Sequence, residues 1–485
     1  MSRLESYFNV FRENIVGIDQ TFQSPFGIQK IIYADWIASG RLYKPIEKRL
    51  MDKLGPFIGN PHTESDITAQ VTTDLYMAAQ KIIKKHVNAN NDDILISSGY
   101  GMTSAINKFL RILGLRVTNH TYFKSNVDNK KRPVVFISSM EHHSNQISWL
   151  NTIAQVERIG FDKNYNIDLN DLENRLKQFK GRVLYGSFTA ASNVTGIKTD
   201  VRKLAVLMHQ YGGYCFIDYA GGAPYLPIDM HPENKDEHID AIFFSPHKFL
   251  GGPGSSGILI FNKSLYRINA PDHPGGGTVL WTDPWGGFKF YDNIELREDG
   301  GTPGFLQTIK AAMAIKLKET MGCKNILERE HKLLSNAFSR FDKIPNIKIL
   351  LGENRNRLAV ISFNIENAHY NLVARLLNDL YGVQVRGGCA CAGTYGHLLF
   401  NIDKKTSHRI TAEIEKGNLR EKPGFVRMSL HPTTTDSELK IIIDAIEDVA
   451  KNYKKYLKHY RYDEKTNEFF HINNQSHRES DFFSF

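Results

Sequence analysis

A lysine placed at the end of an apolar segment has the clearest chemical potential in this sequence. Lys248 follows the run Ala241–Phe244, which has the composition of a buried strand, and precedes a glycine-rich turn. Because a buried ammonium group without a partner is costly, a lysine at such a place suits an amine that forms a Schiff base with an aldehyde cofactor. Ser245 and His247 flank the lysine and could donate to a phosphate of that cofactor. A lysine exposed in a surface turn is the alternative interpretation.

Asp218 ends another apolar run, 214–218, about 30 residues before Lys248. That separation corresponds to one strand–helix–strand unit, so the two side chains could reach opposite ends of one planar ring. A carboxylate can pair with a protonated pyridine nitrogen and strengthen the ring as an electron sink. Asp218 could also simply cap the turn that follows its strand.

A glycine turn near residue 101 opens an amphipathic helix. Gly101, Met102 and Thr103 lie where the helix is expected to begin, and the exposed backbone N–H groups of such a turn bind phosphate well. By itself this signal is weak, because glycine before a helix is more often only a turn. The apolar residues of the helix follow i, i+3, i+4, i+7 spacing: Ile106, Phe109, Leu110 and Leu113.

Two adjacent histidines, His142 and His143, follow a third apolar run. Adjacent side chains cannot easily face one metal ion, and no Cys or His partners stand nearby at ligand spacing, so we expect no metal here. One of the two histidines stacked over a flat cofactor fits better, and a histidine that caps a turn is the rival interpretation.

Two cysteines lie in a segment of small residues, 386–393. Such a segment predicts an accessible loop, which favours a nucleophilic thiolate. The two cysteines could also be half of a metal site, but the sequence offers no second pair of ligands. Cys215, in an apolar run, is instead interpreted as a core thiol. Arg427, in a strand-like segment, is a candidate clamp for a substrate carboxylate, or alternatively a surface arginine.

Short apolar runs alternate with amphipathic ones from about residue 90 to residue 262. This alternation predicts an α/β domain with a mostly parallel sheet covered on both faces. Ligands of such sheets bind at the carboxyl ends of the strands, where Asp218, Ser245 and Lys248 fall. The expected strands are 134–138, 183–187, 214–218, 241–245 and 257–261, and the helices between them include 169–179 and 201–211.

After about residue 305 the pattern changes to that of a smaller α+β domain. Its expected helices are 306–321, 325–341, 370–381 and 436–456, with strands near 347–350 and 358–363. We therefore predict four parts. They are an N-terminal segment packed on the small domain (1–32), a large cofactor-binding domain (33–305), a small C-terminal domain with the cysteine loop (306–460) and a mobile tail (461–485).

Composition limits the class of protein. A chain of 485 residues with 41% hydrophobic residues is expected to be globular, and no run of about 18 apolar residues predicts a membrane span. The beginning of the sequence lacks a signal pattern, so we expect a cytoplasmic location, and four cysteines are too few for a disulfide framework. The net charge of +9 comes from scattered basic residues without a nucleic-acid motif, so we expect no nucleic-acid partner.

Taken together, these segments resemble the class V aminotransferase family of pyridoxal phosphate (PLP) enzymes, and within it the cysteine desulfurase-like branch. The similarity runs from about residue 33 to about residue 449. It implies the PLP-dependent transferase fold of type I, with a seven-stranded sheet, and a homodimer whose sites lie at the interface. The most specific motifs are MEHHSN from Met140, SNVTG from Ser192, DYAGGAPY from Asp218 and SPHK from Ser245, together with GGGT, GTP and the 386–392 loop.

The resemblance also implies roles for individual residues. Lys248 would form the Schiff base with PLP and move the Cα proton, Asp218 would pair with the ring nitrogen, and His142 would stack on the ring. Asn193 would lie near the ring hydroxyl or the substrate. The phosphate would be bound by Gly101, Met102, Thr103, Ser245, His247 and, from a second subunit, Thr278.

In this branch the substrate is an amino acid and the reaction depends on a thiol. Arg427, helped by Arg386, would grip the substrate carboxylate. Cys391 aligns with the catalytic cysteine of desulfurases, so its thiolate would attack the sulfur of PLP-bound L-cysteine. The products would be alanine and a persulfide, which a sulfur-acceptor protein could take. The alternative is another class V reaction that uses Lys248 without a persulfide: transamination, epimerisation or C–S β-elimination.

Two features depart from the pattern of this branch. Gly221 stands where better-known desulfurases carry a glutamine that hydrogen-bonds the ring hydroxyl. The loop reads Cys-Ala-Cys, with Cys389 before Cys391, and a charged insertion separates it from Arg427. The insertion could change access to the thiol.

Overall fold

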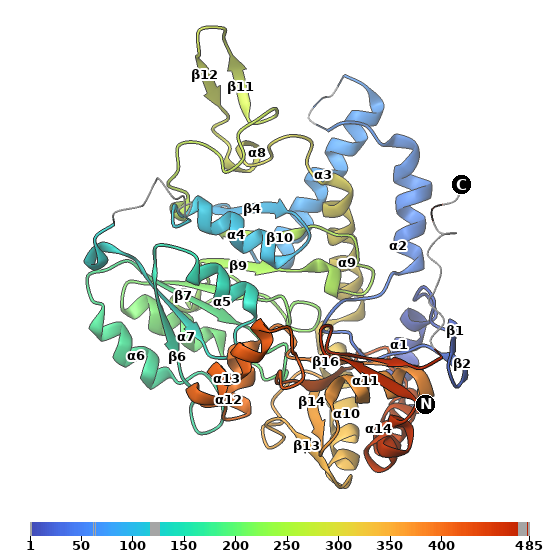
Figure 1. Cartoon of the computed structure of the whole chain (residues 1–485). Helices are drawn as coiled ribbons and strands as arrows, with labels where there is room; N and C mark the ends of the chain where they lie inside the picture. Colours follow the sequence, from blue (N-terminus) through green and yellow to red (C-terminus); the bar gives the residue numbers. More distant parts are fainter. Residues whose placement is uncertain (1, 62, 64, 117–126, 474–482, 484–485) are drawn as a thin grey trace.

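A seven-stranded sheet forms the centre of the computed structural model, which describes residues 2–61, 63, 65–116, 127–473 and 483 (Figure 1). In spatial order its strands are β4 (Asp93–Ser98), β10 (Gly257–Asn262), β9 (Ala241–Phe244), β8 (Tyr214–Asp218), β7 (Leu184–Thr189), β5 (Val134–Ser138) and β6 (Gln155–Ile159). β10 is antiparallel to both neighbours, and the pairs from β9 to β6 are parallel. The predicted α/β fold with a mostly parallel sheet is confirmed.

Helices cover both faces of this sheet, and β5 shows how its sequence supports two cores. Val134 and Phe136 join one apolar cluster with residues of α6 and α7, whereas Val135 and Ile137 join another with α4 and α5. Because successive side chains of a strand point to opposite faces, a strand covered on both faces is expected to be apolar along most of its length, as β5 is from Val134 to Ile137. The covering helices are α4 (Met102–Ile112), α5 (His143–Leu150), α6 (Leu169–Gln178) and α7 (Val201–Gln210).

The sequence prediction named five of the seven strands and omitted β4 and β6, the two edges of the sheet. β6 reads Gln-Val-Glu-Arg-Ile and is only partly covered along most of its length. An edge strand contacts fewer neighbours and needs no continuous apolar run, so apolar runs alone did not reveal it.

The small domain is a four-stranded antiparallel sheet covered by helices. Its strands, in order, are β13 (Ile347–Ile349), β14 (Val360–Ile365), β17 (Phe425–Ser429) and β16 (Arg386–Gly388). Residues of α10 (Cys323–Phe341), α11 (Tyr370–Tyr381) and α14 (Asp436–Leu457) share one apolar cluster with these strands. α9 (Phe305–Met321) leads from the large domain into α10 and packs along α3 (Ile67–His86).

The N-terminal helix α1 (Arg3–Arg12) lies against the start of the small domain. Phe8 and Phe11 are buried in a cluster that includes Met321 and Ile326, and Arg12 donates to the Glu438 carboxylate at 2.7 Å. The remaining elements are β1 (Thr21–Ser24), β2 (Gly27–Lys30), β3 (Ile32–Tyr33), α2 (Lys44–Arg49), β11 (Val279–Thr282), β12 (Phe288–Phe290), α8 (Ile294–Arg297), β15 (Val383–Gln384), α12 (Gly393–Leu399) and α13 (Lys404–Glu415).

The prediction of a mobile tail from residue 461 is wrong for its first part. β18 (Tyr460–Asp463) and β19 (Glu468–His471) form a hairpin, and Phe469 is buried in the cluster of the small domain. The Tyr460 hydroxyl donates to Asp379 of α11 at 2.8 Å, which anchors the hairpin. The aromatic residues of this segment show no period in the sequence because the residues that they pack against lie far away along the chain. Residues 474–482, 484 and 485 lie outside the described part.

Within the described residues, no helix is both long and apolar enough to cross a membrane.

Candidate active site

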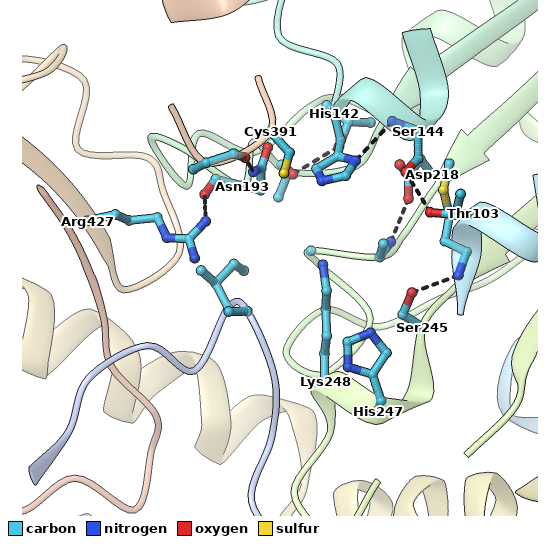
Figure 2. A pocket seen from close by; sticks show the side chains of 18 of the residues that line it. Thr103, His142, Ser144, Asn193, Asp218, Ser245, His247, Lys248, Cys391 and Arg427 are labelled. Carbon is cyan, nitrogen blue, oxygen red and sulfur yellow. Dashed lines mark hydrogen bonds between the residues drawn. The ribbon is translucent and has the colours of Figure 1, made fainter. Parts of the chain in front are cut away.

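A cavity of about 230 Å³ lies at the carboxyl ends of the parallel strands, between the two domains (Figure 2). Its walls come from the segments after β5, β8 and β9, from the cysteine loop and from β17. It brings together eleven of the residues predicted from the sequence: Met102, Thr103, His142, Asn193, Asp218, Ser245, His247, Lys248, Arg386, Cys391 and Arg427. Gly101 lies directly behind this wall, and Thr278 does not line the cavity.

Lys248 follows β9 and points its amine into the cavity (Figure 2). Desolvation lowers the pKa of Lys248 to about 8, and the negative charge of Asp218 opposes this shift. The amine is therefore easier to deprotonate than a surface lysine, as Schiff-base chemistry requires.

Asp218 is buried at the end of β8, where one carboxylate oxygen accepts a hydrogen bond from the Ala220 N–H at 2.7 Å. Desolvation raises its pKa to about 6. A second buried carboxylate, that of Glu141, accepts from the Thr189 N–H at 3.0 Å and from the side chains of Ser138 and Asn145. Desolvation raises the pKa of Glu141 to about 7, and the charge of Asp218 adds to the shift. Sequence reasoning did not single out Glu141.

Hydroxyl groups gather where α4 begins, in an arrangement suited to an anion. The Met102 N–H donates to the Ser245 hydroxyl at 2.8 Å, and the hydroxyls of Thr103 and Ser144 share a hydrogen bond of 2.6 Å. A side chain at Gly101 would place its Cβ 2.9 Å from the Ser245 oxygen, so this approach needs glycine. The helix start adds backbone donors and its positive dipole end. Ser144, which lines the cavity, was missed by the sequence analysis.

The two adjacent histidines have different roles. His142 caps α5, accepting from the Ser144 N–H at 3.0 Å, and its ring faces the space above Lys248 (Figure 2). Desolvation and the charge of Lys248 lower its pKa to about 3, so the ring is neutral. His143 points away and accepts from the Gly393 N–H at 2.8 Å, beside the cysteine loop.

The cysteine loop is tied to the large domain on both sides of its thiol. The His143 N–H donates to the Cys391 carbonyl at 2.7 Å, and the Asn193 amide donates to the Ala390 carbonyl at 2.6 Å. Cys391 is exposed at the cavity, whereas Cys389 is half-buried. Ala390 and Cys391 both have positive φ, 48° and 55°, which presents the thiol on a tight turn. The Asn193 side chain, expected near a ring hydroxyl or substrate, lines the cavity and also holds this loop.

Arg386 and Arg427, the two arginines predicted to bind a substrate carboxylate, both bind the carboxylate of Asp35. Arg427 donates to one oxygen of Asp35 at 2.7 Å, and Arg386 donates to the other at 3.0 Å. The Asn193 carbonyl accepts a further hydrogen bond from Arg427 at 3.0 Å. Arg386 and Arg427 face each other in the register of β16 and β17. Asp35, missed in the sequence, therefore fixes the orientation of both guanidinium groups.

Gly221 and Thr278 have surroundings that bear on the predicted site. Gly221 lines the cavity, where it offers no side-chain donor, and a Cβ there would lie 3.1 Å from the Ala191 carbonyl. The Thr278 hydroxyl donates to the Gly275 carbonyl at 2.6 Å, outside the cavity of its own chain. Thr278 leads into the β11–β12 hairpin, which projects from the large domain (Figure 1).

The sequence from residue 32 to residue 442 matches the family model described as Aminotransferase class-V. The chain belongs to the class V aminotransferase family. This confirms the predicted resemblance and, with it, that the protein is an enzyme of this family.

Curated relatives within the family carry desulfurase names. A probable cysteine desulfurase of Pyrococcus abyssi is 28% identical over 431 residues, which cover 88% of this chain and 96% of the relative. A cysteine desulfurase of Escherichia coli O8 is 31% identical over 286 residues, or 58% of this chain and 66% of the relative. A probable cysteine desulfurase of Halalkalibacterium halodurans is 26% identical over 75% of this chain and 84% of its own.

The fold is also that of solved desulfurases. The apo structure of a cysteine desulfurase from Thermococcus onnurineus NA1 has a TM-score of 0.71 and 23% identity, with coverage of 91% of this chain and 98% of the other. The E. coli cysteine desulfurase CsdA has a TM-score of 0.69, at 20% identity and with coverage of 92% and 98%. These structures confirm the fold that is expected of this family.

Proposed function

We propose that this class V enzyme is a PLP-dependent cysteine desulfurase, which converts L-cysteine to alanine and leaves the sulfur as a persulfide on Cys391. The observation that carries the proposal is the exposed thiol of Cys391 in the same cavity as the desolvated amine of Lys248. The desulfurase names of the curated relatives support it. It is tested by asking whether L-cysteine yields alanine and whether the sulfur is found on Cys391.

The residues of the cavity are suited to the aldehyde, the ring nitrogen, the ring face and the phosphate of PLP. Lys248 would bond the aldehyde, Asp218 would face the ring nitrogen, and His142 would lie over the ring. The hydroxyls of Ser245 and Thr103, together with the start of α4, would hold the phosphate. When bound, PLP supplies an electron sink for the carbanion character that develops next to the amino group.

The protein side chains would then position the substrate and move its proton and sulfur. Arg427, oriented by Asp35, would bind the carboxylate, and Lys248 would carry the Cα proton. The Cys391 thiolate would attack the sulfur of the bound cysteine. The C–S bond breaks, its electron pair stays with the carbon and is protonated there, and the sulfur becomes the outer atom of the persulfide.

We also propose that the enzyme is a homodimer in which Thr278 serves the partner's site. Thr278 is buried outside the cavity of its own chain, and it directly precedes a projecting hairpin with exposed apolar side chains. Trp281 is 52% exposed, Trp285 is 89% exposed and Phe288 is 60% exposed. Such a surface is typical of a contact between chains. A sulfur-acceptor protein would take the persulfide sulfur from Cys391.

Changing Asp218 to asparagine should weaken cofactor binding and reduce turnover by at least about 100-fold. The amide lacks the negative charge that would keep the ring nitrogen protonated, while the side chain keeps its size. A titration of the apo-enzyme with PLP, followed by absorbance, measures the first effect. Asp92→Asn, the same change at an exposed carboxylate paired with Lys263, is the control. Unchanged kinetics in Asp218→Asn would remove this residue from the site.

Changing Arg427 to lysine should raise the KM for L-cysteine roughly 10- to 100-fold, the range of one or two lost hydrogen bonds to charged groups. A lysine cannot donate to Asp35, to the Asn193 carbonyl and to a substrate carboxylate in the planar geometry of a guanidinium. Steady-state kinetics separates KM from kcat, and Arg386→Lys should have the smaller effect because that side chain is half exposed. A loss confined to kcat would contradict the clamp.

A further inference from the structure

Two histidines and an aspartate converge at the amino ends of β8 and β9, the end of the sheet opposite the cavity. His209 lies in the last turn of α7, His238 follows the short helix Lys235–Glu237, and Asp240 directly precedes β9. The two imidazole rings are stacked, with centroids 3.9 Å apart and an interplanar angle of 8°. One ligand atom from each of the three residues lies within 4.8 Å of the other two.

Both rings are held by backbone carbonyls on one side. The Nδ1 of His209 is 2.9 Å from the Asp236 carbonyl oxygen, and the Nδ1 of His238 is 2.7 Å from the Lys235 carbonyl oxygen. A carbonyl oxygen only accepts, so each Nδ1 carries the hydrogen. In the neutral ring, each Nε2 therefore presents a lone pair.

Both lone pairs face the same carboxylate. The Nε2 of His209 is 2.9 Å from one oxygen of Asp240, and the Nε2 of His238 is 3.3 Å from the other. An ionised carboxylate also only accepts, so the two neutral rings meet Asp240 acceptor to acceptor. Protonating both rings would instead place two like charges in stacked contact against one carboxylate. A second proton on one ring would let its Nε2–H donate to Asp240, but it would leave the other neutral ring facing the carboxylate as an acceptor. A cation that receives electron pairs from all three groups resolves the conflict for both rings.

We propose that His209, His238 and Asp240 bind a divalent transition metal ion, with Zn²⁺ as the best match to two imidazoles and one carboxylate. A backbone carbonyl on Nδ1 is the arrangement that orients metal-binding histidines through Nε2. Asp240 is 6% exposed and is fixed by the Cys215 N–H at 2.7 Å, while the His238 side chain is 39% exposed. Water can therefore supply the fourth ligand of a tetrahedral site.

The metal would stabilise the fold and take no part in the reaction. It would join the end of α7 and the loop at His238 to the start of β9. Five residues of extended chain separate Asp240 from Ser245, so the metal would lie roughly 16 Å from the cavity.

The first test is zinc binding to the PLP-loaded enzyme with Cys389→Ser and Cys391→Ser, which removes competing thiol ligands of the loop. Calorimetry should find one Zn²⁺ per chain, and adding His238→Ala should weaken it at least about 100-fold. His273→Ala is the matched control, because His273 is an exposed histidine 3.1 Å from a single carboxylate, that of Asp272. The zinc affinity of the enzyme should not change in this control variant. Equal zinc affinity with and without His238, or no binding at all, would overturn the proposal.

A second measurement uses the unaltered chain and does not depend on any variant folding. Crystals soaked in Zn²⁺ should give an anomalous peak about 2.0–2.2 Å from the Nε2 of His209, the Nε2 of His238 and an oxygen of Asp240. A peak found only elsewhere, or no peak, would contradict the site.

Discussion

Replacing Lys248 by alanine should abolish turnover, by at least about 10⁴-fold, while leaving the chain folded. The amine would be both the bond to the cofactor aldehyde and the carrier of the Cα proton, so one deletion removes two functions. The fold should survive because the deleted group is a desolvated amine, whose burial costs rather than contributes stability. Turnover of L-cysteine and thermal unfolding followed by circular dichroism measure the two effects.

Another buried lysine provides the matched control for this experiment. Desolvation lowers the pKa of Lys318 to about 8 as well, but its amine donates to the Leu226 carbonyl at 2.6 Å, outside the cavity. Borohydride reduction of the holoenzyme should attach the cofactor to the peptide that contains Lys248, in the wild type and in Lys318→Met alike. Normal turnover in Lys248→Ala, or labelling at Lys318, would refute the cofactor assignment.

Replacing Cys391 by serine should remove alanine formation from L-cysteine, by at least about 10³-fold, because a hydroxyl is a far weaker nucleophile toward sulfur than a thiolate. Cofactor binding should be unchanged, since the loop is held by backbone contacts to Cys391 and Ala390 that the substitution keeps. Chromatography of the amino-acid products and the absorbance of bound PLP report the two properties.

Cys389→Ser is the control, two residues away in the same loop. It should retain activity within about tenfold, because Cys389 does not line the cavity. If Cys389→Ser proves the more damaging change, the sulfur is carried by Cys389. If both variants and the wild type form pyruvate rather than alanine, the enzyme is a C–S β-lyase, the alternative that needs only Lys248.

The residues that could be predicted from the sequence stand next to strands with an unmistakable pattern. Asp218 ends one strand buried on both faces and Lys248 follows another, and parallel strands bring their carboxyl ends to one edge of the sheet. Cys391 and Arg427 lie in the other domain, where the small residues of the loop and a strand-like segment gave only a general indication of a reactive thiol and a carboxylate clamp. Motif resemblance then selected Cys391 from the two cysteines.

The missed residues depend on contacts that sequence distance conceals. Asp35 meets Arg427 across 392 positions, and Glu141 acts through a network that joins β5 to β7. His209, His238 and Asp240 are assembled by a helix, a loop and a strand, so their spacing matches no metal-binding motif. In each case the sequence shows a charged or titratable residue. Only the fold shows that this residue is buried or half-buried and which residue is its partner.

Following the sulfur of L-cysteine in the wild-type enzyme decides whether Cys391 is the sulfur-accepting thiol. A single turnover without reductant should release alanine and add the mass of one sulfur atom to the peptide that contains Cys391, and added reductant should remove that mass as sulfide. Alanine without a mass change on this peptide, or the added sulfur on another cysteine, would contradict the assignment of Cys391 as the sulfur-accepting thiol.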